Sequence, residues 1–142
     1  MTPLERDLPS HDLADHVSEL RVRLRAGSHA DLLAEAGRAL AEIQLRGTPG
    51  AATGDWRRLE ISAHDSAGLL ADWLNELIFL AETERWVATE FEVEQVDGSS
   101  MRVRARGVTL DQAPGLVKAA TLHGLRVDDA PGGVTGEVVL DL

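Results

Sequence analysis

The sequence contains no cysteine among its 142 residues. Without thiols the chain cannot form disulfides, carry out thiolate catalysis, or hold a zinc ribbon or a cysteine-ligated iron–sulfur cluster. A chain without cysteine has no need of an oxidising compartment, and we therefore expect a cytoplasmic protein.

Long apolar runs are absent as well. The most apolar stretch, residues 69–81, is interrupted by Asp72, Asn75 and Glu76 and is too polar to span a membrane. The N-terminal stretch MTPLERDLPSHD has neither the basic flank nor the apolar centre of a signal peptide. The sequence therefore predicts a soluble globular protein that does not associate with membranes.

Positive charge is scarce. The chain has 14 Lys and Arg residues against 24 Asp and Glu residues, which gives a formal net charge of −10. Nucleic-acid binding requires clustered cations that neutralise phosphates, so we expect no direct binding of nucleic acid. An acidic surface suits solubility, a metal cation or a basic protein partner.

The motifs of several enzyme classes are missing too. The sequence has no dinucleotide-binding G-x-G-x-x-G and no G-x-S-x-G nucleophile elbow. The glycine-rich segment GTPGAATG, residues 47–54, lacks the lysine of a phosphate-binding loop, and the five histidines show no H-E-x-x-H spacing. No familiar catalytic motif therefore identifies this chain as an enzyme.

The patterns that are present predict a strand and then a helix in the N-terminal part. Residues 20–25 alternate leucine or valine with arginine, which is the period of a half-buried strand. Ser28, with Asp31 three residues further on, is the expected N-cap of a helix whose apolar stripe runs to Ile43. The Gly- and Pro-containing segment 46–54 is expected to be a loop.

The rest of the chain predicts one more helix among several strands. Asp65 or Ser66 can cap a helix that is apolar on more than one face, which indicates deep burial. Strands are expected around residues 56–61, 87–96, 101–108, 117–127 and 134–142. The predicted fold is α+β, with two helices packed on a mixed, largely antiparallel sheet in the order β-α-β-α-β-β-β-β.

The end of the chain offers a candidate cation site. Asp141 and Leu142 place a side-chain carboxylate next to the α-carboxylate at a predicted strand end. Adjacent anions repel each other unless a cation lies between them, and Ca²⁺ and Mg²⁺ prefer such oxygen ligands. Glu19, at the start of the first strand, can supply a third carboxylate. From spacing alone a solvated chain end is the more common arrangement, and both interpretations remain open.

Several motifs resemble those of the archease family, small acidic proteins that assist the GTP-dependent tRNA-splicing RNA ligase. That family opens with E-H-T-A-D before an alternating strand, where this chain has DHVSE at residues 15–19. The helix ADWLNELIFL, residues 71–80, resembles the family's E-W-L-N-E-L-L-F-L, and VKAATLHG, residues 117–124, resembles V-K-A-x-T-Y-H-G. The family also ends in aspartate plus one aliphatic residue, as this chain does at Asp141 and Leu142.

The resemblance implies a single archease-like domain over residues 11–142, preceded by a flexible lead-in at residues 1–10. It implies an accessory factor and not an enzyme, one that promotes guanylylation and multiple turnover of the RNA ligase in tRNA splicing. The ligase would be its partner. It further implies that Glu19, Asp141 and Leu142 bind a divalent metal ion, Ca²⁺ or Mg²⁺.

The sequence departs from the family pattern in the first motif, where DHVSE stands for E-H-T-A-D, and at one position near the C-terminus. The family's metal-binding aspartate in the first motif falls on Glu19, whose longer side chain can also coordinate a metal. An alternative register, HDLAD at residues 11–15, would make Asp15 the ligand but requires an insertion before the strand. The family's tyrosine is replaced by Leu122.

Four further residues are candidates for orienting a ligand or contacting a partner. His16 can hydrogen-bond a ligating carboxylate and orient it. Lys118 falls on a family lysine and can reach a phosphate or an acidic group on a partner. His123 shares a predicted strand face with apolar residues and is expected in the core with a satisfied hydrogen bond, whereas Asp72 coincides with an acidic position of the family.

Two other functions remain open. The departures at Glu19 and Leu122 are compatible with a chaperone-like modulator of another RNA-modifying protein, such as a methyltransferase. A small metal-dependent hydrolase would need an open metal position and a base, for which only His16 is available.

Overall fold

The structure, a computed structural model, describes residues 18–142. In this part of the chain two helices and six strands follow one another in the predicted order β-α-β-α-β-β-β-β. The strands are β1 (Glu19–Ala26), β2 (Thr53–Ser62), β3 (Trp86–Val96), β4 (Ser100–Thr109), β5 (Ala119–Ala130) and β6 (Gly133–Asp141), and the helices are α3 (His29–Leu45) and α4 (Ser66–Glu84). The predicted α+β class and element order are confirmed, and the predicted lead-in at residues 1–10 lies outside the described residues.

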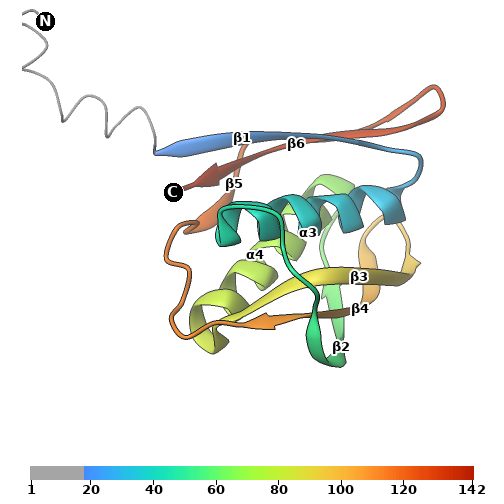
Figure 1. The fold of residues 1–142 in the computed structure, drawn as a ribbon. Coiled ribbons are helices and arrows are strands. Elements are labelled where there is room, and N and C mark those ends of the chain that lie inside the picture. The colour runs from blue at the N-terminus through green and yellow to red at the C-terminus, as the bar shows by residue number, and fades with distance from the viewer. Residues whose placement is uncertain (1–17) are drawn as a thin grey trace, which may run out of the picture.

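The strands form two separate sheets, which differs from the single mixed sheet that we expected. Sheet A has the order β1-β6-β5 and sheet B the order β2-β4-β3, and every pairing in both is antiparallel. Both helices lie between the two sheets (Figure 1). A helix that is apolar on more than one face has to be covered on both sides, and one sheet can cover only one of them.

The helices begin and end where local chemistry satisfies their terminal backbone groups. The Ser28 hydroxyl accepts a hydrogen bond from the Asp31 N–H at 3.1 Å, and the Asp65 carboxylate accepts one from the Gly68 N–H at 2.7 Å. At the other ends, Arg46 and Arg85 adopt the left-handed conformation that stops a helix. Both predicted N-caps are confirmed, with Asp65 and not Ser66 in the second.

Trp73 of α4 occupies the middle of the core and is fully buried. Its indole N–H donates to the Leu33 carbonyl at 2.9 Å, which ties α4 to α3, and its ring meets that of Phe91 edge to face at 5.7 Å. Gly37 lets Phe91 approach α3, because a Cβ at that position would lie 2.6 Å from the ring. One apolar cluster thus joins both helices to both sheets.

Each sheet consequently has one face against the helices and one face toward solvent. In β1, Val22 and Leu24 are the inward residues, whereas Arg21, Arg23 and Arg25 are exposed. No helix in the part of the chain that the structure describes is long and apolar enough to cross a membrane.

Candidate functional site

The strand register brings the predicted carboxylate ligands together at one end of sheet A. Glu19, the first residue of β1, lies directly opposite Asp141, the last residue of β6, and Ala119 of β5 lies opposite Asp141 on the other side. Residues directly opposite in an antiparallel pair point to the same face with Cβ atoms about 4.5–5.5 Å apart. Two carboxylates separated by more than a hundred residues of sequence therefore share one small area of the solvent face.

The final residues of β6 are held in place on both sides. The Leu142 N–H donates to the Ser18 carbonyl at 2.8 Å, and the Asp141 carbonyl accepts a hydrogen bond from the Lys118 N–H at 2.8 Å. The Leu142 side chain is half-buried and packs against the core. Of the two interpretations of this chain end, a frayed and solvated terminus does not describe it.

A side chain of α4 also fixes β5 at this point. The sequence pattern predicts only that Asn75 interrupts an apolar helix, and this prediction is incomplete. The Asn75 amide donates to the Ala120 carbonyl at 3.1 Å and accepts from the Ala120 N–H at 2.8 Å. Both bonds are partly buried, so Asn75 positions the strand residue next to Ala119. A polar amide in a helix that is apolar on more than one face is the sequence feature that could have indicated this hydrogen-bonding role.

The remaining predicted residues occupy different positions. Lys118 is exposed and immediately precedes β5, beside the strand ends, whereas Asp72 is exposed on α4. The prediction that His123 lies in the core is wrong, because its side chain is exposed. The register of β5 against β6 shifts between Thr121 and Arg126, and this shift breaks the alternation on which the prediction depended.

Some predicted residues cannot be placed. His16 and the alternative ligand Asp15 lie outside the described residues. Within residues 18–142, no three His, Cys, Asp or Glu side chains lie close enough together to hold a metal ion. The metal-binding role of Glu19, Asp141 and Leu142 stays a prediction, to which the structure adds the pairing of the first two.

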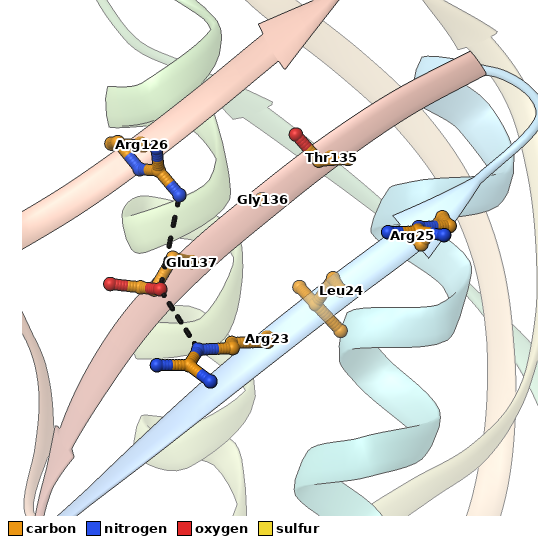
Figure 2. Close-up of a pocket in the computed structure, with 7 residues that line it drawn as sticks. All are labelled: Arg23, Leu24, Arg25, Arg126, Thr135, Gly136 and Glu137. Carbon is orange, nitrogen blue, oxygen red and sulfur yellow. Dashed lines mark hydrogen bonds and ion pairs between the residues drawn. The ribbon is translucent and has the colours of Figure 1, made fainter. Parts of the chain in front are cut away.

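A cluster of charged residues that the sequence analysis did not single out lies further along the same face. Glu137 of β6 accepts a hydrogen bond from Arg21 at 2.6 Å and one from Arg23 at 3.2 Å, and Arg126 of β5 lies 3.8 Å from it. Figure 2 shows Arg23 and Arg126 on opposite sides of the Glu137 carboxylate. The hydrogen bond from Arg21 is the main cause of a lowered Glu137 pKa, which burial opposes and Arg23 reinforces. Glu137 is therefore ionised at neutral pH.

Comparison with known proteins identifies the group to which the fold belongs. The family model of the archease protein family (MTH1598/TM1083) matches residues 11–142. Protein archease of Methanopyrus kandleri is 30% identical over 135 residues, which span 90% of this chain and 96% of that protein. Protein archease of Methanothermobacter thermautotrophicus is 36% identical over 92 residues, which span 61% of this chain and 66% of that protein.

Solved structures agree in fold. The solution structure of Methanobacterium thermoautotrophicum protein 1598 superposes with a TM-score of 0.69 at 27% identity, covering 89% of this chain and 94% of that one. The crystal structure of a Thermotoga maritima protein described as an archease and possible chaperone has a TM-score of 0.63 at 18% identity, covering 89% and 93%. The sequence motifs, the fold and the match over nearly the whole chain lead to one conclusion: this protein belongs to the archease family.

Proposed function

We propose that this protein is an accessory factor that promotes guanylylation and multiple turnover of a GTP-dependent tRNA-splicing RNA ligase. Family membership and the resemblance of the motifs support the proposal. The structural observation that supports it most directly is the register that sets Glu19 opposite Asp141 at the end of sheet A. This register brings Glu19, the last residue of the first motif, next to Asp141 near the end of the domain.

The groups at the site fit a hard divalent cation such as Ca²⁺ or Mg²⁺. Glu19 and Asp141 supply side-chain carboxylates on one face, and the α-carboxylate of Leu142 is the proposed third ligand. When bound, the cation would supply positive charge that offsets carboxylate repulsion and can coordinate the phosphate oxygens of a nucleotide.

The chain's own residues keep these ligands in position. The backbone bonds of Leu142 to Ser18 and of Lys118 to Asp141 hold three strand ends together. Asn75 fixes the adjoining residue of β5 from below the sheet. A site held in this way is arranged before a partner binds, so little ordering is needed on contact with the ligase.

The overall charge suits a partner of the opposite sign. A protein with a formal net charge of −10 is attracted to the basic groove in which an RNA ligase binds its substrate. The carboxylate site would then lie next to the metal-dependent active centre of the ligase.

The decisive experiment is multiple-turnover ligation by the RNA ligase of the same organism, with limiting enzyme, GTP and metal. We expect this chain to raise the product well beyond one turnover. Asp141→Asn removes the charge with little change of shape and should abolish this activation, as should extra residues appended after Leu142. Asp55→Asn, an exposed position on sheet B, is the matched control and should activate normally.

The same variants separate the proposed site from the proposed function. Calorimetric titration with Ca²⁺ and Mg²⁺ should show binding that Asp141→Asn weakens and Asp55→Asn does not. Full activation by Asp141→Asn would disprove the role of the site. A ligase that completes its first turnover but gains nothing from the native chain would disprove the function.

A second candidate is a chaperone-like modulator of another RNA-modifying protein, such as a methyltransferase. The Thermotoga maritima relative is described as a possible chaperone, and Leu122, which replaces the family's tyrosine, is 76% exposed. Affinity capture from the host followed by mass spectrometry distinguishes the candidates by whether the ligase or a methyltransferase is enriched.

A further inference from the structure

Several exposed arginines lie close together on the solvent face of sheet A, although the protein as a whole is acidic. Arg21, Arg23 and Arg25 follow one another at alternate positions of the edge strand β1, and Arg126 joins them from β5. These four residues are named here the arginine cluster. All four are exposed, and the Arg23 side chain is 78% exposed.

Two carboxylates pair with the cluster within residues 18–142. Glu137 contacts Arg21, Arg23 and Arg126, and its own side chain is only 13% exposed. Asp128 forms one further ion pair with Arg126 at 3.5 Å. Among residues 18–142, the arginine cluster forms ion pairs with these two carboxylates, and Glu19 and Asp141 lie on the same face at the Arg21 end. Around Arg23, Arg25 and Arg126 the arginines outnumber these two paired carboxylates, in a protein whose net charge is −10.

The shape of this face suits a chain of anions more than a single one. A shallow depression of about 540 Å³ is lined by Arg23, Arg25, Arg126, Thr135 and Glu137, and Figure 2 shows that these residues come from three neighbouring strands. From Arg21 to Arg25 the strand advances roughly 13 Å, at about 3.3 Å per residue. Guanidinium groups in such a row can contact successive phosphates along a backbone.

We propose that the arginine cluster binds the phosphate backbone of single-stranded RNA, with Arg23 and Arg126 exchanging Glu137 for phosphate oxygens and Arg25 adding a further guanidinium group. Because no aromatic residue lines the depression, binding would depend on phosphates and not on base identity. The cluster begins at the residue pair next to Glu19 and Asp141, on the same face. A strand bound there would run toward the carboxylate site.

This inference departs from the expectation, drawn from net charge, that the chain binds no nucleic acid. Net charge describes the average surface, whereas a phosphate responds to the groups within about 8–10 Å at physiological salt. The choice of RNA over other polyanions rests on the proposed function, but the binding test below uses the isolated chain and needs no ligase.

The test measures the fluorescence anisotropy of a labelled oligouridylate titrated with the protein at several salt concentrations. The double variant Arg23→Ala/Arg25→Ala is compared with Arg58→Ala/Arg102→Ala, which removes two exposed arginines from sheet B and leaves the same net charge. We expect the first variant to bind weakly, with a slope of log affinity against log salt reduced by about 1.4, because each phosphate contact to a single strand contributes about 0.7. The control should bind like the native chain.

The proposal would be overturned by equal losses in both double variants, by unchanged binding in the first variant, or by no binding to the native chain. GTP and inorganic triphosphate serve as competitors, and displacement of the RNA at stoichiometric concentrations of either would show a nucleotide site in place of a backbone site. Failure of RNA binding with intact ligase activation refutes this inference alone, and the reverse result refutes the proposed function alone.

Glu137→Gln provides an independent test. Glutamine keeps the shape and one acceptor but removes the internal anion that competes with phosphate, so RNA should bind more tightly than to the native chain. If the cluster only stabilises the sheet, this variant will leave RNA affinity unchanged.

Discussion

Two strands of this protein carry the same charge pattern but lie in different surroundings. Arg21 to Arg25 in β1 and Arg102 to Arg106 in β4 both read Arg-X-Arg-X-Arg, with apolar residues between the arginines. Both rows point to solvent from an antiparallel sheet. The strands differ in position, because β4 is the centre of sheet B whereas β1 is an edge of sheet A.

On sheet B the arginines meet carboxylates from the neighbouring strand. Arg104 pairs with Glu92 at 3.5 Å and Arg106 with Glu90 at 3.0 Å, while Glu94 accepts two hydrogen bonds from Arg58. The guanidinium groups of Arg104 and Arg106 also stack on the ring of Trp56 at 4.9 and 4.8 Å. Each of these arginines has a carboxylate partner on the same face, although the buried Nε of Arg104 has no hydrogen-bond partner within residues 18–142.

On sheet A the corresponding row meets a different strand. Opposite Arg21, Arg23 and Arg25 lie Val139, Glu137 and Thr135, so the paired strand offers this row one carboxylate, which contacts Arg21 and Arg23. The same local pattern therefore gives paired arginines on sheet B, whereas on sheet A two arginines share one carboxylate. The identity of the paired strand, and not the row itself, decides whether arginines are available for a ligand.

The largest effect is expected from a substitution in the core that the two sheets share. Trp73→Ala leaves a cavity between the helices and removes the hydrogen bond to Leu33, so we expect a loss of about 3–5 kcal/mol in the free energy of unfolding. Urea denaturation followed by circular dichroism measures it. Phe79→Ala, at a position that is 57% exposed, should cost far less. Equal losses in the two variants would show that Trp73 does not join the sheets.

A smaller change should affect sheet A alone. Asn75→Ala leaves the N–H and carbonyl of Ala120 without partners in a partly buried place, which should cost about 1–3 kcal/mol. Hydrogen exchange should show faster exchange in β5 and unchanged protection in β4. The exposed Asp72→Ala is the control on the same helix and should stay within about 0.5 kcal/mol of the native chain. Faster exchange in both sheets would contradict this assignment.

The smallest effect concerns acid stability and compares the two faces directly. The pKa of Glu137 lies below its ordinary value of 4.5, mainly through the hydrogen bond from Arg21, and that of Glu94 is lowered mainly by the hydrogen bond from Arg58. A carboxylate with a lowered pKa stabilises the folded state above pH 4.5, and this contribution is lost as the pH falls through the folded-state pKa.

Glu137→Gln and Glu94→Gln should therefore each reduce the loss of stability that occurs below pH 4.5. We expect the larger reduction for Glu137, which is the less exposed of the two and contacts more arginines. Urea midpoints measured from neutral pH down to the acid transition provide the comparison. A variant whose midpoints follow the native pH profile would show that the ion pairs at that face contribute nothing to acid stability.

Much of the fold followed from local patterns. The alternation in residues 20–25, the caps at Ser28 and Asp65 and the turn between β3 and β4 each depend on neighbours within a few positions. Such features are encoded where they occur, so they were predictable without knowledge of the remaining chain.

The errors arose where distant segments meet. The prediction that His123 lies in the core assumed that inward and outward side chains alternate along the whole of β5. The register of β5 shifts between Thr121 and Arg126, where Gly124 adopts a φ of 71°, so the alternation does not continue. The hydrogen bonds of Asn75 with the backbone of Ala120 were not predicted either, because the two residues lie on different elements. A backbone group on another element leaves no periodic trace in the helix that binds it.

The sequence by itself determined the order of the elements, their caps and, through motifs spread along the chain, membership of the archease family. Only the tertiary structure decided that the helices lie between two sheets, that Glu19 faces Asp141, and that Arg21 and Arg23 of β1 share Glu137. The physical reason is that local periodicity specifies which face of a strand a residue occupies, whereas only strand pairing specifies what lies opposite.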